Sequence, residues 1–449
     1  MLERPVRAQI SNKIAYKMRH EPSNAVKYRH DRPHSRTVDN PLYKLYNVCM
    51  ELKDIYAAQK RLEGTVHHTP LEHSATFSAQ TGGDVYLKCE NLQKTGSFKV
   101  RGAFNKISKL DVDGNTEVFS CSAGNHAQGV AYSATRRGVR SVIYMPLSTP
   151  IAKISATEGY GAKVVLHGDV FDDAQAQAIA DCRDRGGVFI PPFDDEDVIA
   201  GQGTVGLEIL KDIPDADAVF VPAGGGGLLA GVAFAIKNIN PRIKIYGVQA
   251  EGAAAIAKSF KSDTVCLDKI YTIADGIAVK RPGDITMKYI NEYVDDILTV
   301  SDNDIASAII SLIERAKEIV EPAGASGLAA ALKCDRARGK KSVCVLSGGN
   351  IDVSFIHKII EKGLISRGRQ IRLSVILSDK PGSLEDVSRI LAKNGANVIA
   401  IQYDRVNAEL SLNETILHIT CEVSGAAHGQ KVFSALKSAG YVLMTREAN

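Results

Sequence analysis

Hydrophobic and polar residues follow two different rhythms along this chain. From about residue 50 to residue 362, short runs rich in β-branched residues alternate with longer amphipathic stretches. The runs typical of strands are EVFSCSA, SVIYMP, KVVLHG, AVFVPAG, KIYGVQA and KSVCVLSGG. The stretches that predict helices are AQGVAYSATRRG, FDDAQAQAIADCRDRG, GLLAGVAFAIKNI and DIASAIISLIERAKEIV. This alternation predicts an α/β body of βαβ units, with a largely parallel sheet covered by helices on both faces.

The second rhythm begins after KGLISRGRQ, which predicts a linker over residues 363–370. The strand-like runs beyond it are IRLSVIL, NVIAIQYDRV, ETILHITCEV and YVLMTRE, and the helix-like runs are EDVSRILAKNG and GQKVFSALKSAG. Their order predicts a small ferredoxin-like βαββαβ domain over residues 371–449. This segment offers no clustered acid, base or nucleophile, so we expect the chemistry in the body, residues 50–362.

The first segment, residues 1–49, has no clean periodicity and is rich in Arg, His and Pro. It carries ten Lys and Arg against four Asp and Glu, a net charge of +6, and the remainder is close to neutral. We expect a disordered basic extension. Two alternatives stay open: a transit peptide, against which Glu3, Glu21 and Asp31 weigh, and a true start at Met50, where MELKDIYAAQKRL begins an amphipathic helix.

The composition of the 449 residues is that of a globular protein with more than one domain, with 45% apolar and 24% charged residues. A net charge of +4 and the absence of tryptophan argue against a nucleic-acid partner. No apolar stretch reaches the length of a membrane span. The eight cysteines are scattered without a CxxC pair, which is typical of buried, reduced thiols. We therefore expect a cytoplasmic enzyme with no membrane partner.

The strongest local motif is VPAGGGGLLAG, residues 221–231, in which a strand leads through four glycines into an apolar helix. Glycines let backbone N–H groups approach an anion, and a helix N-terminus adds partial positive charge, so the motif predicts a phosphate site. A dinucleotide fold is a rival interpretation, because the run also fits G-x-G-x-x-A with Glu251 downstream. That pattern alone is weak, and it lies in the middle of the chain.

Two further strand-to-helix joints carry polar and glycine residues, CSAGNHAQGVA from Cys121 and CVLSGGN from Cys344. At the carboxyl ends of parallel strands, such turns can converge on one crevice. Lys99 follows an aromatic residue in ENLQKTGSFKVRGA and has a turn-forming glycine on each side. A surface lysine is the ordinary interpretation of Lys99 alone. Together with a phosphate site, it suggests pyridoxal phosphate (PLP) bound covalently through a lysine.

The motif set SFKVRGA, SAGNHAQGVA, GGGGLLAG and SGGN resembles that of fold-type II PLP enzymes, and more narrowly that of threonine dehydratases (threonine ammonia-lyases) and their serine racemase relatives. The resemblance covers about residues 50–362. It implies a tryptophan synthase β-like body of two open parallel-sheet subdomains. DKPGSLEDVSRILAKNGANV resembles an ACT domain, an amino-acid-sensing module, present once as in the shorter threonine ammonia-lyases.

The resemblance also implies roles for individual residues. Lys99 would hold the cofactor and later move the substrate α-proton, and Phe98 would pack on the cofactor ring. The ring hydroxyl would face Asn125, and the pyridine nitrogen would face Ser347. The phosphate would lie on Gly224, Gly225, Gly226 and Gly227. The substrate carboxylate would bind to the loop Ser122, Ala123, Gly124, Asn125 and His126. A neutral serine at the pyridine nitrogen leaves the ring a weaker electron sink, which favours prompt loss of a β-hydroxyl over transamination.

Two positions favour elimination over racemisation. Racemases that this chain resembles place a serine at the position of Ala123, and alanine has no proton to give to the second face of the substrate. They also bind a divalent metal near YGVQAEGAAA, with a glutamate and an aspartate where this chain has Gln249 and Ala255. We therefore predict no metal site of that kind. A monovalent cation on backbone carbonyls stays open.

The resemblance thus predicts conversion of L-threonine to 2-oxobutanoate and ammonia, and of L-serine to pyruvate. The alternatives are a serine or threo-hydroxyaspartate dehydratase, a serine racemase, and, less favoured, a β-replacement enzyme such as a cysteine synthase. From another class, a catalytically silent amino-acid sensor stays open, although the intact Lys99 argues against it.

In the ACT-like segment, DKPGSL places Gly382 at a turn that a ligand backbone could approach closely. We expect an effector site at Gly382, Ser383 and Leu384, occupied by isoleucine or valine. A purely structural, dimer-forming role for this segment is the alternative. A homo-oligomer, dimer or tetramer, is expected by resemblance.

Overall fold

The computed structural model describes residues 50–113, 115–406 and 410–444. The predictions for residues 1–49 therefore lie outside the described residues. The described part begins at Met50, whose backbone nitrogen donates to the Tyr289 hydroxyl at 3.0 Å. Helix α1 (Leu52–Leu62) follows at once, as its amphipathic pattern predicted, and buries Ile55, Ala58 and Leu62.

The larger sheet has six strands in the order β1-β2-β10-β7-β8-β9. All neighbouring pairs are parallel except β1 with β2. The strands are β1 (Leu71–His73), β2 (Asp84–Lys88), β7 (Ala218–Pro222), β8 (Lys244–Ala250), β9 (Asp296–Val300) and β10 (Lys341–Val345). The central strand β7 is buried along its whole length, as expected for a parallel strand covered on both faces.

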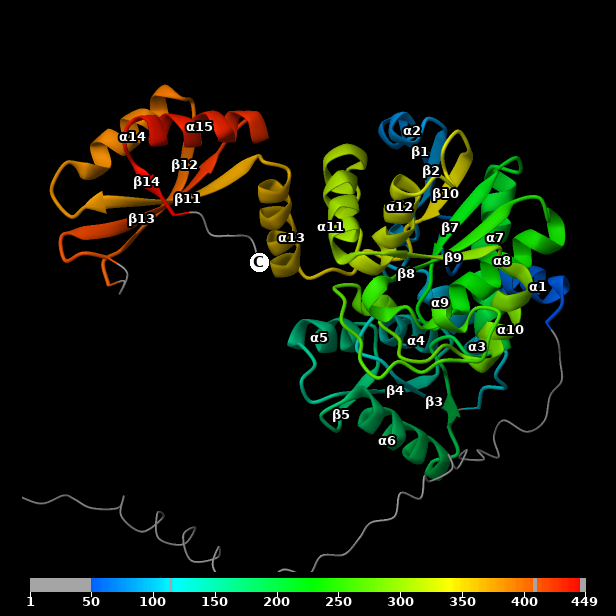
Figure 1. Ribbon diagram of the computed structural model, residues 1–449. Coiled ribbons are helices and arrows are strands. Elements are labelled where there is room, and N and C mark those ends of the chain that lie inside the picture. The colour runs from blue at the N-terminus through cyan, green and yellow to red at the C-terminus, as the bar shows by residue number, and fades with distance from the viewer. Residues whose placement is uncertain (1–49, 114, 407–409, 445–449) are drawn as a thin grey trace, which may run out of the picture. The chain divides into compact units, whose positions relative to one another are not determined.

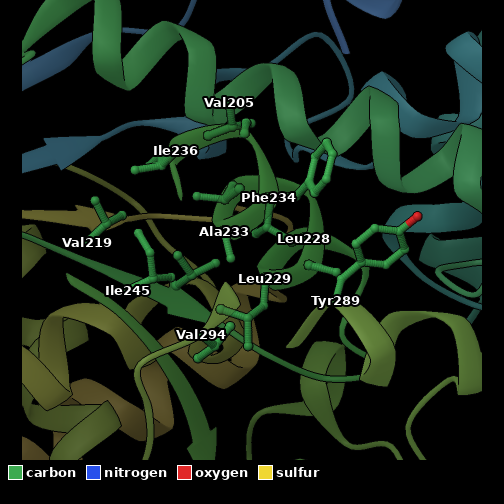
Figure 2. Close-up of a cluster of buried hydrophobic side chains, with 14 of the residues drawn as sticks. Val205, Val219, Leu228, Leu229, Ala233, Phe234, Ile236, Ile245, Tyr289 and Val294 are labelled. Atoms are coloured by element: carbon green, nitrogen blue, oxygen red, sulfur yellow. The ribbon is translucent and has the colours of Figure 1, made fainter. Parts of the chain in front are cut away.

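Helices cover both faces of this sheet (Figure 1). They are α1, α2 (Ala75–Thr81), α7 (Glu196–Asp212), α8 (Gly227–Ile239), α9 (Ala255–Ser259), α10 (Asp284–Tyr293), α11 (Asp302–Ser311) and α12 (Pro322–Lys333). Helix α13 (Val353–Ser366) packs against α11. Because side chains of a strand alternate between faces, Val219 packs into one apolar cluster and Phe220 into another. Figure 2 shows the first cluster, in which Val219 and Ile245 of the sheet meet Leu229 of α8 and Val205 of α7.

The smaller sheet is wholly parallel, with the strand order β5-β4-β3-β6. Its elements are α3 (Lys99–Ser108), β3 (Glu117–Cys121), α4 (Asn125–Arg136), β4 (Arg140–Met145), α5 (Ile151–Gly159), β5 (Lys163–Leu166), α6 (Phe171–Asp184) and β6 (Val188–Phe189). Val118 packs with residues of α3 and α4, whereas Phe119 packs with residues of α6. The prediction of an α/β body with two parallel-sheet subdomains is confirmed.

The C-terminal sheet is antiparallel, in the order β12-β13-β11-β14. Its elements follow as β11 (Gln370–Ser378), α14 (Ser383–Lys393), β12 (Asn397–Asp404), β13 (Glu414–Glu422), α15 (Ala426–Ser438) and β14 (Val442–Leu443). Alternate residues of β11, such as Leu373 and Val375, pack against Leu391 of α14 and Val432 of α15. The ferredoxin-like βαββαβ order predicted from the sequence is confirmed.

Two stretches differ from the pattern-based expectation. The first half of the predicted linker 363–370 is helical, because α13 continues to Ser366. The helix expected over residues 304–320 instead changes to a π-helical turn at Leu312–Ala316, and Lys317 then adopts a left-handed conformation with φ 63°. A left-handed residue ends a helix. Pro322 further along keeps Glu321 extended, since a proline disfavours the helical conformation in the residue before it.

Among the described residues, we find no helix with the length and apolar character needed to cross a membrane.

Candidate active site

Lys99 is the first residue of helix α3, and a network of backbone contacts holds the chain before it. Ser97 forms a bridge with Gly348, and the Phe98 N–H donates to the Ser347 carbonyl at 3.1 Å. Gly96 has φ 71°, so its conformation favours glycine. The turn after β10 therefore positions the start of α3, and two of the sequence motifs meet there.

The Lys99 side chain is partly buried. Its Nζ donates to the Pro192 carbonyl at 2.7 Å and lies 5.3 Å from the centre of the Phe98 ring. Burial lowers the pKa of Lys99 to about 8, and the carboxyl of Glu321 opposes the shift. A neutral amine, the nucleophilic form of lysine, is thus readily populated near neutral pH.

The acceptor of this amine belongs to the strap, which we define as residues 190–195 between β6 and α7. The Ile190 carbonyl accepts from the His126 ring and from the Ser120 hydroxyl, each at 2.9 Å. At the other end, the Asp194 carboxylate accepts from the backbone N–H groups of Ile285 and Thr286 at the start of α10. The strap thus links the smaller sheet to the helices of the larger one. Sequence reasoning did not single it out.

The glycine turn, Gly224 to Gly227, lies between β7 and α8 as predicted. Gly226 has φ 101°, and a Cβ added to Gly225 would collide with the ring of Phe193 in the strap. The Gly225 carbonyl accepts from the Thr286 hydroxyl at 2.7 Å. The first N–H groups of α8 have no acceptor within their own helix. The turn is therefore a cradle of four glycines whose N–H groups, within the described part of the chain, are left available by the helix, which fits a phosphate group.

The loop from Ser122 to His126 joins β3 to α4. Gly124 is the N-cap of α4, and its N–H donates to the Ser122 hydroxyl at 3.2 Å. Ala123 and Asn125 are partly exposed, but His126 is buried. Burial and the nearby Lys99 lower the pKa of His126 to about 3, so its ring is neutral. Its Nδ1 has no hydrogen-bond partner among the described residues.

Asn125 connects this loop to the rest of the site. Its Nδ2 donates to Glu321 Oε1 at 2.7 Å, and its Oδ1 accepts from Asn350 Nδ2 at 2.8 Å. A Cβ added to Gly348 would lie 3.1 Å from Asn125 Nδ2. The turns that carry Asn125 and Ser347 therefore lie against each other, and Ser347 itself is buried.

Glu321 is the site residue that sequence reasoning missed. It is the N-cap of α12, held extended before Pro322, and is only 5% exposed. Burial and the neighbouring Asp275 carboxylate raise its pKa to about 8. Functional sites typically combine shifted pKa values of this kind, here a carboxyl that is neutral near pH 7 and a lysine whose pKa is lowered. The segment EPAGAS around it carries no signal that would have singled out this glutamate.

The structure thus brings Phe98, Lys99, Asn125, Ser347 and, through the strap, Gly225 into one connected region. The two parallel sheets contribute from their carboxyl ends, where ligands bind in open α/β folds.

The positions that bear on a metal site make contacts of their own. The buried Gln249 donates to the Ala223 carbonyl at 3.1 Å and accepts from Ala257 N–H at 2.9 Å. Among the described residues, Glu72, Cys89 and Glu318 bring ligand-type atoms within 4.8 Å of one another, a group that the prediction of no metal site had not considered.

The predicted effector residues lie at the start of α14. Gly382 is exposed with φ 91°, and the Ser383 hydroxyl donates to the Ser378 carbonyl at 2.8 Å. Leu384 is partly buried against the domain core. A hollow of about 360 Å³ lies beyond the other end of α14, with Gly395 and His428 among its lining residues.

Comparisons with known proteins agree with this arrangement. The family model described as "Pyridoxal-phosphate dependent enzyme" matches residues 62–348. The L-threonine ammonia-lyase of Thermotoga maritima is 44% identical over 392 residues, which cover 87% of this chain and 98% of that protein. The solved processed form of threonine deaminase isoform 2 from Solanum lycopersicum is 39% identical, covering 69% of this chain and 86% of that one, with a TM-score of 0.66. Maize serine racemase is 35% identical, covering 71% and 99%, with a TM-score of 0.66.

Proposed function

This chain belongs to the pyridoxal-phosphate dependent enzymes, and within them to the threonine ammonia-lyases; from that premise, we propose that it converts L-threonine to 2-oxobutanoate and ammonia. The observation that carries the proposal is the partly buried Lys99 amine, which donates to the Pro192 carbonyl at the junction of the two sheets and has its pKa lowered to about 8. The names of the relatives support threonine as the substrate.

The residues present fit the cofactor. The glycine cradle and the first N–H groups of α8 would hold the phosphate, since a side chain at Gly225 would collide with Phe193. Ser347 would face the pyridine nitrogen, and Asn125 would donate to the ring hydroxyl. Phe98 would pack against the ring. Bound there, pyridoxal phosphate supplies an electron sink for the electron pair left on the substrate Cα.

Lys99 has two tasks in this proposal. Its amine holds the cofactor before substrate arrives, and once released it takes the proton from the substrate Cα. The β-hydroxyl leaves with its bonding electrons and, with one proton, forms water. A water molecule later adds at Cα, ammonia leaves, and the carbon skeleton is released as 2-oxobutanoate. With L-serine the same steps give pyruvate.

The loop Ser122 to His126 would bind the substrate carboxylate. It combines the N-terminus of the twelve-residue helix α4 with the Ser122 hydroxyl, and both attract an anion. Ala123 offers no proton to the opposite face of the substrate, which supports elimination rather than racemisation. The likeness to maize serine racemase makes a serine racemase the second candidate.

The test is the formation of 2-oxoacid by the purified protein loaded with pyridoxal phosphate. Lys99→Ala should lower turnover of L-threonine by at least about 100-fold, because it removes the proton carrier. The matched control is Lys109→Ala at the end of the same helix, whose exposed amine pairs with Asp197 instead. Full activity of Lys99→Ala would contradict the proposal. D-serine formed from L-serine without 2-oxoacid would favour the second candidate.

We also propose that the C-terminal domain binds a branched-chain amino acid at Gly382, Ser383 and Leu384 and thereby regulates activity. The exposed, left-handed Gly382 supports this, because a ligand backbone can approach it closely. Calorimetric titration with isoleucine and valine tests the idea. Absence of binding to either amino acid would remove it.

A homo-oligomer is part of the proposal as well. Among the described residues, strand β12 is paired on one side only, and it exposes Val398, Ile399, Ile401 and Tyr403. An open strand edge with exposed apolar side chains is suited to pairing with a second copy. The cysteines of the described residues are all unpaired, which supports a reducing compartment such as the cytoplasm.

A further inference from the structure

The amide of Asn125 is held at both of its polar atoms. Glu321 accepts from Nδ2 at 2.7 Å, while Asn350 donates to Oδ1 at 2.8 Å. The two partners come from different segments, the start of α12 and the turn after β10. An asparagine amide has nearly the same shape when rotated by 180°, so only its hydrogen bonds decide which end presents a donor.

Asn350 decides the orientation. Its Nδ2 can only donate and is itself held by the Thr95 carbonyl at 2.8 Å, so it requires the Asn125 oxygen. The Asn125 nitrogen then faces Glu321 Oε1, which accepts from it, so the proton of a neutral Glu321 carboxyl would lie on the other oxygen. The second N–H of Asn125 then has no partner among the described residues.

Glu321 is well fixed for such a task. Its carboxyl is buried beside Gly348, where an added Cβ would lie 2.5 Å from Oε1, and a Cβ on Gly276 would be in van der Waals contact with Oε1 at 3.5 Å. The charged groups that face it are Asp275, Lys153 on α5 and Lys99 on α3. None of them forms an ion pair with Glu321 among the described residues, and Lys153 pairs with Asp275 at 2.9 Å. Asn125 is therefore its direct hydrogen-bond partner.

We propose that Glu321 and Asn350 are positioning residues that fix the amide of Asn125, so that its remaining N–H is presented to the ring hydroxyl of the cofactor. The proposal rests on the proposed function, because it takes Asn125 as the partner of that hydroxyl. Neither residue has to touch the reacting atoms. Both act through Asn125, which is the feature that separates this role from a general contribution to packing.

The experiment measures the dissociation constant of pyridoxal phosphate from the apoprotein, by absorbance titration, in a double-mutant cycle. Glu321→Ala and Asn125→Ala should each weaken binding by about tenfold, as for loss of one hydrogen bond. The double variant should bind no more weakly than Asn125→Ala alone, within about twofold. If the two substitutions instead raise the dissociation constant independently, so that the double variant shows the product of the two single effects, the proposal is overturned.

Two further variants keep the test decisive if Glu321→Ala unfolds. Glu321→Gln retains an acceptor and should bind cofactor within about threefold of the unchanged protein. Asn350→Ala, at an exposed position, should weaken cofactor binding by about the same factor as Glu321→Ala. Combined with Asn125→Ala, it should cause no further loss of affinity. Unchanged affinity in Asn350→Ala, or loss of affinity in Glu321→Gln equal to that in Glu321→Ala, would contradict the proposal.

The matched control is Glu318→Gln. This buried glutamate lies three residues away and accepts from Asn91 rather than from Asn125. Its cofactor affinity should stay unchanged. Failure of the unchanged protein to bind pyridoxal phosphate would refute the proposed function itself. Normal binding combined with multiplying effects in the cycle would refute only the positioning role.

Discussion

The catalytic body and the C-terminal domain differ in how the environment shifts the pKa values of the ionisable side chains compared here. In the body, Lys99, His126 and Glu321 lie in one region, and burial shifts the pKa of each toward its neutral form. In the C-terminal domain, Arg389 is exposed, and its partners Glu385 and Asp386 raise its pKa and stabilise its charge. That domain is stabilised instead by an apolar core between one sheet face and two helices.

This difference shows where the chemistry lies. Burial of an ionisable group without an opposite charge costs free energy, so a fold retains several such groups together where they serve a reaction. Exposed ion pairs cost little and contribute little. The two regions can be told apart experimentally by the size of the effects that mutations have on stability, on cofactor binding and on pH dependence.

The largest effect should come from the buried ion network beneath the site. Arg101, two residues after Lys99, contacts Glu90 at 2.7 Å and Glu208 at 2.6 Å, and all three side chains are buried. Arg101→Met would leave both carboxylates with less opposing charge. We expect the free energy of unfolding to fall by ~3–5 kcal/mol, measured by chemical denaturation. A loss below ~1 kcal/mol would show that this buried ion network contributes no more to stability than exposed ion pairs do.

The next effect concerns the glycine cradle. Gly225→Ala should collide with Phe193 and displace the strap, which also holds the acceptor of the Lys99 amine. Overpacking of this kind costs ~1–3 kcal/mol, so we expect pyridoxal phosphate to bind about tenfold more weakly in an equilibrium titration.

Two variants check the cause of that effect. Adding Phe193→Ala to Gly225→Ala should restore part of the affinity by removing the collision. Gly159→Ala, where a Cβ meets open space, should leave binding unchanged. Equal binding by Gly225→Ala and the unchanged protein would mean that the cradle does not hold the cofactor.

The third prediction uses the pKa of Lys99, lowered by burial from 10.5 to about 8. Only the neutral amine captures the cofactor, and its fraction rises with pH until the pKa is passed. The rate of capture by the apoprotein should therefore rise about tenfold from pH 6 to pH 7 and level off above pH 8. Stopped-flow absorbance measures this rate. A rate that still rises between pH 9 and pH 10 would indicate an ordinary surface lysine.

The smallest effect should come from the C-terminal domain. Arg389→Ala removes two exposed pairs on helix α14, with Glu385 at 2.6 Å and with Asp386 at 2.8 Å. Exposed helix pairs contribute little to stability, so the midpoint of denaturation should stay close to that of the unchanged protein. A loss as large as that of Arg101→Met in the same denaturation assay would erase the contrast between the two regions.

Much of the fold could be predicted from the sequence because its elements are locally specified. The run GLLAGVAFAIKNI forms α8 from Gly227 to Ile239, as its apolar pattern predicted. Helix α7 was not among the expected elements, since its glycines at 201, 203 and 206 obscure the helical pattern. Those glycines allow close packing, because a Cβ at Gly201 would collide with the backbone of α3, a contact that local sequence does not reveal.

The sequence by itself determined the motifs and their order: a lysine after Phe98, a four-glycine turn before a helix, and polar turns after Cys121 and Val345. These depend on short-range chemistry, such as φ preferences and helix termini. Only the tertiary structure decided that the Pro192 carbonyl accepts a hydrogen bond from the Lys99 amine and that Glu321 accepts one from Asn125. Such pairings join residues that are 93 and 196 positions apart, and the desolvation that shifts their pKa values exists only once the two sheets are packed together.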